Sequence, residues 1–105
     1  MADHQEELMT GEGMKRLHAT VIGRVQGVSY RYFVMDQALN LDLVGWVRNR
    51  WNGSVEVTAE GPRQNLETLL DAMRKGPPMA MVENVEFELS PWTGEFTGFD
   101  LRSTA

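Results

Sequence analysis

The sequence has 105 residues, contains no cysteine, and has no hydrophobic run long enough to cross a membrane as a helix. Without cysteine there are no disulfide bonds, no thiolate zinc sites and no cysteine nucleophile. Packing alone must therefore stabilise the fold, which agrees with an expected location in the cytoplasm. A basic excess is also absent, because ten Lys and Arg residues stand against fifteen Asp and Glu residues. Nucleic-acid-binding domains typically carry such an excess, so we expect no nucleic-acid partner.

Most of the negative charge lies at the N-terminus. The first 13 residues hold four acidic side chains and no Lys or Arg, so they contribute −4 of the formal net charge of −5: Asp3, Glu6, Glu7 and Glu12. The remainder has ten basic and eleven acidic residues and is close to neutral. Residues 1–13 are polar and lack periodicity, which is typical of disorder. We therefore expect a disordered acidic extension over 1–13 and a single domain over 14–105.

Hydrophobic periodicity predicts the order strand, helix, strand, strand, helix, strand. The strands are expected over 15–23, 43–50, 54–60 and 81–89, and the helices begin after Ser29 and at Pro62. A short fifth strand at the sheet edge is expected within 96–102. This order predicts the ferredoxin-like α+β fold, an antiparallel sheet with two helices on one face.

Three local expectations follow from the strand patterns. Asn52-Gly53 predicts a tight hairpin, because both residues tolerate positive φ. In the segment 54–60, alternation predicts that Val55, Val57 and Ala59 lie on a buried face, while the polar residues lie on a face that is wet or free of helices. In the last main strand, five alternate residues are expected to share one face: Met81, Glu83, Val85, Phe87 and Leu89.

The segment Gly-Arg-Val-Gln-Gly-Val-Ser-Tyr-Arg at 23–31 joins the first strand to the first helix. Its two glycines allow a tight turn, and Ser29 is expected to cap the helix through its hydroxyl. A helix start offers unpaired N–H groups, and Arg31 adds a full positive charge. Gly-x-x-x-Gly alone is a weak pattern, with the spacing of neither a dinucleotide fingerprint nor a Walker motif. The combination nevertheless predicts a pocket for a phosphate.

The predicted topology brings Asn49 to this turn. A strand–helix–strand crossover returns the second strand parallel to the first, so both strands end at the same rim of the sheet. The planar fork of Arg31 suits a phosphoryl dianion. The Asn49 carboxamide can hold a water but cannot act as a general base at neutral pH. This chemistry favours an acyl phosphate, whose carboxylate leaves without a proton, over a phosphate monoester.

Two segments resemble the signatures of the acylphosphatase family. The first is 23–31, and the second is Gly-Trp-Val-Arg-Asn-Arg-Trp-Asn-Gly-Ser-Val-Glu-Val at 45–57. Glu60-Gly61 and Gly76-Pro77-Pro78 also stand where that family has them, so the resemblance covers about residues 14–102. The sequence departs from the family pattern at Asp42, at Ser29-Tyr30 and at Asn52, and none of these departures removes a catalytic group.

The resemblance implies a ferredoxin-like fold and metal-free hydrolysis of acyl phosphates. It implies that Arg31 binds the phosphate and that Asn49 positions the attacking water. It also implies a phosphate cradle of backbone amides over the turn 24–30, with six contributors: Val25, Gln26, Gly27, Val28, Ser29 and Tyr30.

The residues leave two other functions open. The turn alone also suits a non-catalytic module that binds an anion or an acyl phosphate. The fold order is shared with RNA-recognition domains, but the strand 54–60 lacks stacking aromatic residues and the charge is negative. No His, Asp or Glu group has metal-ligand spacing, so we expect no metal and no cofactor. The expected partner is a small-molecule acyl phosphate, and the domain is expected to be a monomer.

Overall fold

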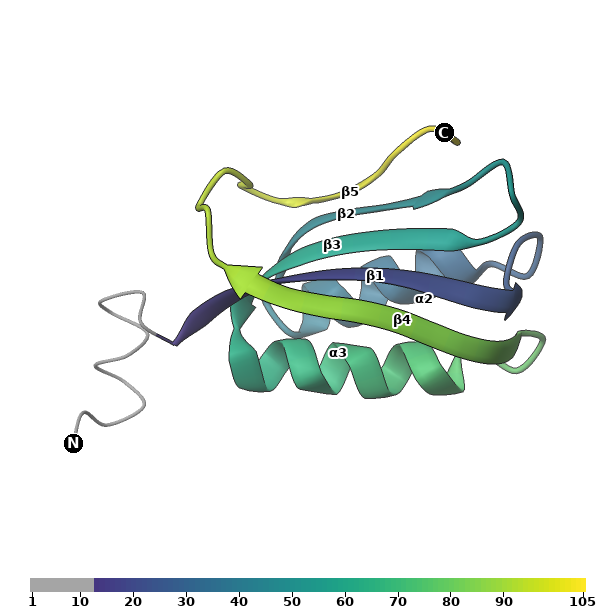
Figure 1. Cartoon of the computed structure of the whole chain (residues 1–105), viewed down its shortest axis with the longest axis horizontal. Coiled ribbons are helices and arrows are strands. Elements are labelled where there is room, and N and C mark those ends of the chain that lie inside the picture. The colour runs from purple at the N-terminus through teal and green to yellow at the C-terminus, as the bar shows by residue number, and fades with distance from the viewer. Residues whose placement is uncertain (1–12) are drawn as a thin grey trace.

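The computed structural model describes residues 13–105, which form a five-stranded sheet and two helices (Figure 1). The elements in chain order are β1 (Met14–Arg24), α2 (Tyr30–Asn40), β2 (Val44–Asn49), β3 (Val55–Pro62), α3 (Arg63–Lys75), β4 (Met81–Pro91) and β5 (Phe99–Leu101). The predicted order is confirmed. The predicted extension lies outside the described residues except for Gly13, whose carbonyl oxygen accepts a hydrogen bond from the Arg63 N–H at 3.0 Å.

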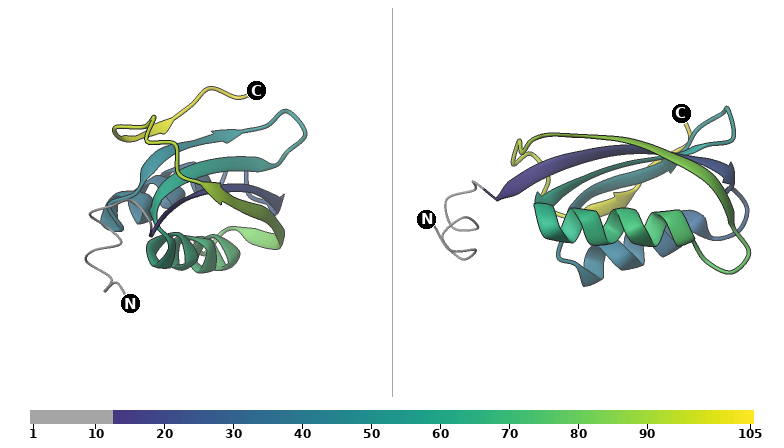
Figure 2. Two further views of the ribbon diagram at one scale, coloured as in Figure 1. Left: turned by 60° about the vertical axis from the view of Figure 1, so that its left-hand side comes forward. Right: turned by 60° about the horizontal axis from the view of Figure 1, so that its bottom comes forward.

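The strands are arranged in the order β4-β1-β3-β2-β5. β1 pairs antiparallel with β3 and β4, and β2 pairs antiparallel with β3, so β1 and β2 run in the same direction. The short fifth strand pairs parallel with β2, which makes the sheet mixed. Both helices lie on one face of the sheet (Figure 2). The structure thus confirms the ferredoxin-like α+β arrangement.

The core lies between the helices and the inner face of the sheet. Helix α3 carries four apolar residues at helical spacing, which predicts one buried stripe, and all four are buried: Leu66, Leu69, Leu70 and Met73. The strands contribute small and branched side chains that are fully buried, among them Ala19, Val21, Val47, Val55 and Val57. Burying one such aliphatic side chain stabilises the fold by roughly 1.5–3 kcal/mol, so this interface holds the helices against the sheet.

The outer face of β3 is free of helices, as expected (Figure 2), but its polar side chains are nevertheless buried. The exposed fraction is 7% for Glu56, 1% for Thr58 and 0% for Glu60. The Glu60 carboxylate accepts hydrogen bonds from the N–H and Oγ1 of Thr93, from the Gly94 N–H, and from Arg16 Nη1. A carboxylate can be buried when its lone pairs are satisfied in this way. Glu60 therefore fixes the segment after β4 across the outer face.

The predicted face of β4 is also only partly correct. The register between β1 and β4 shifts at Ile22/Gly23, and Val82 rather than Glu83 packs against the core. A bulge inserts one residue and reverses the alternation beyond it. The chains approach so closely here that a Cβ on Gly23 (φ 137°) would overlap the Met81 carbonyl oxygen. Gly23 is thus required by contact with β4, whereas the conformational freedom of Gly27 serves the turn.

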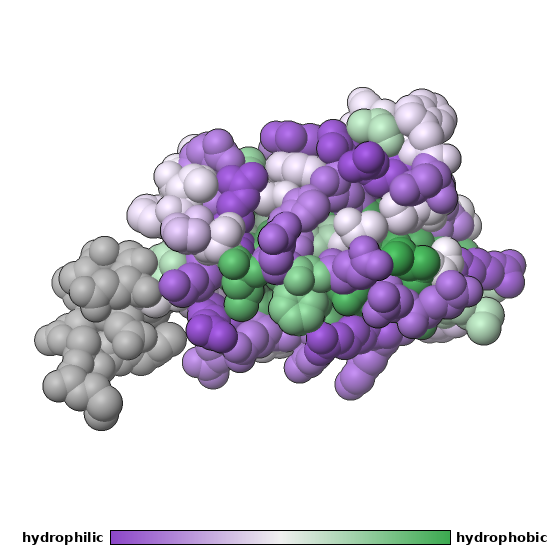
Figure 3. All heavy atoms as spheres, viewed as in Figure 1, coloured by the Kyte–Doolittle hydropathy of each residue, from purple (hydrophilic) through white to green (hydrophobic). Residues whose placement is uncertain are grey.

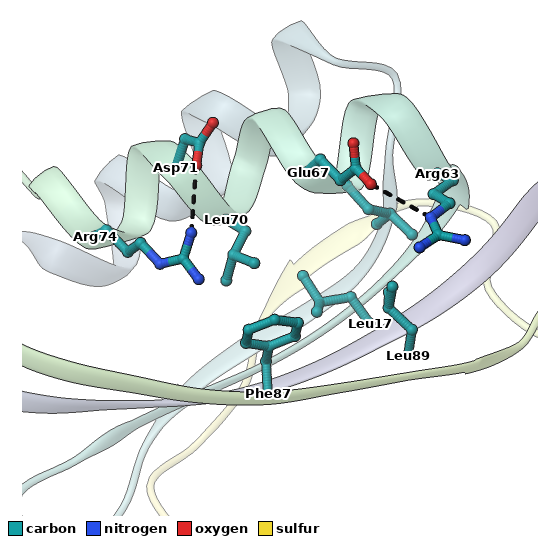
Figure 4. Close-up of a pocket in the computed structure, with 9 residues that line it drawn as sticks. Leu17, Arg63, Glu67, Leu70, Asp71, Arg74, Phe87 and Leu89 are labelled. Carbon is teal, nitrogen blue, oxygen red and sulfur yellow. Dashed lines mark hydrogen bonds and ion pairs between the residues drawn. The ribbon is translucent and has the colours of Figure 1, made fainter.

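A hydrophobic groove separates α3 from β4 and β1. Hydrophobic atoms are exposed along this border among hydrophilic side chains (Figure 3). In the groove Leu17, Phe87 and Leu89 project from the strands toward Leu70 of the helix (Figure 4). Phe87 is 45% exposed and lies under the Arg74 guanidinium, which is 5.6 Å from the ring centroid. The arginine covers part of an aromatic ring that the helix does not reach.

Replacing Glu60 by Gln should destabilise the protein by about 3 kcal/mol, because the change leaves buried donors without an adequate acceptor. Urea unfolding at pH 7 measures the loss. Glu67→Gln is the matched control, since Glu67 is 60% exposed and its one ion pair within residues 13–105 is with exposed Arg63. The control should change stability by less than about 0.5 kcal/mol. Equal losses of stability in the two variants would contradict the role of Glu60 in fixing the segment after β4.

Candidate active site

The turn after β1 and the loop after β2 lie at the same end of the sheet (Figure 1). A cavity there is lined by Val25, Gly27, Ser29, Tyr30, Arg31, Tyr32 and Asn49. The structure therefore brings Arg31 and Asn49 together, along with four of the six residues predicted for the backbone cradle. The side chains of the other two lie outside the cavity lining. The Gln26 side chain bonds to the β2–β3 loop, and Val28 packs against the core.

The turn owes its shape to two left-handed residues, Gly27 with φ 73° and Ser29 with φ 60°. Ser29 is the N-cap of α2, as predicted, but its hydroxyl makes no capping hydrogen bond. The reason is its backbone, since a capping serine normally has extended φ and ψ. Left-handed residues alternating with other conformations are typical of turns whose N–H groups converge on an anion.

The first turn of α2 is anchored at Tyr30. Its hydroxyl donates a 2.7 Å hydrogen bond to the Met73 carbonyl oxygen on α3, and the residue is fully buried. Burial raises the pKa of Tyr30, so the phenol stays protonated and remains a donor. No acidic residue occupies the first turn of α2. The positive end of the helix dipole, which lies beside Arg31, is therefore not neutralised by a side chain of α2.

Asn49 ends β2, and its side-chain carbonyl is buried. Its Oδ1 has no hydrogen-bond partner within residues 13–105. Its main-chain oxygen accepts a 3.1 Å hydrogen bond from the Ala105 N–H, and the Trp51 N–H donates to the Ala105 oxygen at 3.0 Å. The C-terminal segment thus continues along β2 beyond β5 and holds the Asn49 backbone, while the buried Oδ1 remains an acceptor without a partner in the described residues.

The predicted hairpin at Asn52-Gly53 joins β2 to β3. Asn49 pairs with Val55, and the Arg50 N–H donates to the Ser54 oxygen, so the loop has three residues, 51–53. Only Gly53 has positive φ, at 93°. Asn52 instead accepts hydrogen bonds from the N–H and hydroxyl of Ser54 through its side-chain oxygen. A three-residue hairpin of this kind needs one left-handed residue at its end.

On the outer face, Glu56 forms ion pairs with both neighbours of Asn49, Arg48 and Arg50. Its Oε1 accepts from Arg48 Nε at 2.7 Å and from Arg50 Nη1 at 3.0 Å, and His18 Nε2 lies 2.7 Å from Oε2. Burial raises the pKa of Glu56, but the hydrogen bonds from His18, Arg48 and Arg50 outweigh it and lower the pKa to about 2. The carboxylate therefore stays charged at neutral pH.

On the outer face, Trp46 exposes little ring surface on which a nucleobase could stack. The guanidinium carbons of Arg48 and Arg102 lie 4.8 and 4.7 Å from the centroid of its ring. The side chain is only 7% exposed, so the arginines cover the aromatic surface. This observation adds to the charge argument against an RNA-recognition function.

Sequence reasoning missed three contributors to this region. Tyr32 lines the cavity. Its position in the first turn of the helix that follows the 23–31 segment could have identified it from the sequence. The Gln26 side chain and Glu56 act across the hairpin, and finding them required the register of β2 with β3. Within the described residues, no group of three or more potential ligands gathers for a metal ion. No helix there is long and apolar enough to span a membrane.

Fold and cavity together define a ferredoxin-like domain in which a left-handed turn at a helix start and Asn49 line one cavity at the same rim. The family model for acylphosphatase matches residues 17–101. The acylphosphatase of Pelotomaculum thermopropionicum is 48% identical over 86 residues, which is 82% of this chain and 94% of that protein. The crystal structure of acylphosphatase from Bacillus subtilis is 36% identical with a TM-score of 0.81, covering 84% of this chain and 98% of that one. An acylphosphatase structure from Coxiella burnetii is 37% identical with a TM-score of 0.82, covering 88% and 96%. The chain belongs to the acylphosphatase family.

Glu56→Gln should remove a pH-dependent part of the stability. A pKa of about 2 in the folded state lies below the ordinary 4.5, so this group stabilises the fold above about pH 4.5 and loses its effect as pH falls toward 2. We expect Glu56→Gln to lower the free energy of unfolding by about 2 kcal/mol at pH 7. The free energy of unfolding of this variant should also fall less steeply with decreasing pH than that of the wild type. Urea unfolding between pH 7 and pH 2.5 measures this. Exposed Glu86→Gln on β4 is the control, and a wild-type pH slope in Glu56→Gln would contradict the assignment.

Proposed function

We propose that this protein hydrolyses a small-molecule acyl phosphate to a carboxylate and inorganic phosphate without a metal ion. The observation that carries the proposal is one cavity lined by Arg31, the left-handed turn and Asn49, whose Oδ1 has no hydrogen-bond partner within residues 13–105. Family membership supports the same reaction, since the relatives named above are acylphosphatases.

The phosphate would be held by Arg31 and by backbone N–H groups. The guanidinium is partly exposed and makes no ion pair within residues 13–105, so its fork is available. The amides proposed for the cradle are those of Val25, Gln26, Gly27, Val28, Ser29 and Tyr30. Two left-handed residues and the start of an 11-residue helix favour anion binding at this position.

The attacking water would be positioned by Asn49. A buried carbonyl oxygen without a protein donor is best satisfied by a water molecule. The water oxygen forms the new bond to phosphorus while the bond from phosphorus to the acyl oxygen breaks. The acyl group leaves as a carboxylate, which needs no proton, and the proton of the water passes to the phosphate or to solvent. Positioning and charge stabilisation then suffice for the reaction.

Asn49→Ala should bind inorganic phosphate with nearly wild-type affinity and lose at least about a hundredfold in kcat, because only the water loses its acceptor. Benzoyl phosphate hydrolysis measures the rate, and calorimetry measures the phosphate affinity. The wild-type rate should be unchanged by a chelator. Full turnover by Asn49→Ala would refute the water-positioning role. Phosphate binding by a wild-type protein that does not hydrolyse benzoyl phosphate would instead indicate a non-catalytic binding module.

Arg31→Ala should lose both phosphate affinity and rate, by a few kcal/mol in transition-state stabilisation. Arg31→Lys keeps the charge without the fork and should recover only part of the loss. Arg24→Ala is the control, since this exposed arginine belongs to the same segment but does not line the cavity. If Arg24→Ala and Arg31→Ala lose activity equally, a general positive field and not the fork of Arg31 binds the phosphate.

The proposal also includes a monomeric protein that acts in the cytoplasm. Its support is that one chain supplies both halves of the cavity and that the sequence has no cysteine. Light scattering on the purified chain tests the monomer, and a dimer at assay concentrations would contradict it.

A further inference from the structure

The side chain of Gln26 connects the two halves of the cavity from outside it. Its Nε2 donates to the Arg50 oxygen at 2.7 Å and to the Ser54 oxygen at 2.8 Å. Both hydrogens of the amide are therefore used, each on a backbone carbonyl. Gln26 lies between Val25 and Gly27, both of which line the cavity. Its side chain extends from the centre of the turn to the two residues that flank the β2–β3 loop, Arg50 and Ser54.

The two carbonyls belong to the residues that close the hairpin. The Arg50 N–H donates to the Ser54 oxygen at 2.8 Å, and the Gly53 N–H donates to the Arg50 oxygen at 3.1 Å. Arg50 directly follows Asn49, so a shift of these carbonyls shifts the carboxamide. Within residues 13–105, the bonds of Gln26 are the only side-chain hydrogen bonds between the segment 24–30 and the loop.

We propose that Gln26 is a positioning residue that sets the distance between the phosphate-binding turn and Asn49, an inference that rests on the proposed function. The turn and the loop are otherwise fixed from different sides. Tyr30 ties the turn to α3, while Glu56 and Ala105 hold the loop from the outer face and the sheet edge. Neither set of contacts fixes one half against the other. Direct attack by water needs alignment between them, and a misplacement of about 1 Å can cost a hundredfold in rate.

Gln26→Met removes both donors and keeps the length of the side chain. We expect kcat for benzoyl phosphate to fall at least about tenfold, while the Kd for inorganic phosphate changes less than about threefold. Gln26→Glu is the second variant, and its carboxylate facing two carbonyls should lower kcat further. Gln37→Met is the matched control, because Gln37 lies partly buried on α2 away from the cavity and should keep wild-type kinetics. Circular dichroism and urea unfolding verify that each variant is folded.

A double-mutant cycle with Asn49→Ala separates positioning from general destabilisation. If Gln26 acts through Asn49, adding Gln26→Met to Asn49→Ala should lower kcat by less than about twofold. Additive losses, a matching loss of phosphate affinity, or wild-type kcat in both folded Gln26 variants would each overturn the positioning role. Such results leave the proposed function intact if the wild type hydrolyses benzoyl phosphate. An inactive wild type would refute the proposed function, and the role of Gln26 with it.

Discussion

The register between β2 and β3 is the constraint on which the rest of the site depends. The three-residue loop pairs Asn49 with Val55, so the odd-numbered residues of both strands face the helices. Arg48, Arg50 and Glu56 then share the outer face and form ion pairs there. A two-residue loop would place Glu56 opposite Asn49 among the core valines, and burying that carboxylate without partners would be costly.

Two buried carboxylates replace the missing layer on the outer face of the sheet. A small domain with helices on one side only would leave β3 open to water. Instead, Glu56 forms hydrogen bonds with His18 and two arginines, whose side chains cover the strand. Glu60 accepts hydrogen bonds from Thr93 and Gly94 and so fixes their segment against the same face. Each carboxylate offsets its desolvation with several donors, some of them charged. The contacts of Glu56 also tie the side chains of Arg48 and Arg50, the two neighbours of Asn49, to β3.

The two halves of the cavity are held in place by different contacts. Left-handed residues and the Tyr30–Met73 hydrogen bond shape the turn, whereas strand pairing and the C-terminal segment hold Asn49. Such preorganisation suits a reaction in which aligned dipoles and one charge stabilise the transition state. It also explains why a single side chain that bridges the halves, Gln26, can control their alignment.

The sequence alone determined the element order, the core stripe of α3 and the meeting of Arg31 with Asn49, because periodicity and the crossover rule act locally or through simple topology. Glycine chemistry likewise located the turn. Only the tertiary structure decided the bulge that turns Val82 inward, the burial of Glu56 and Glu60, and the left-handed backbone of Ser29. The bulge and the buried carboxylates depend on the register of strands that are distant in sequence, and a shift of one residue reverses which face each side chain occupies. The contacts of Gln26 belong to the same class, since its partners lie 24 and 28 residues further along the chain.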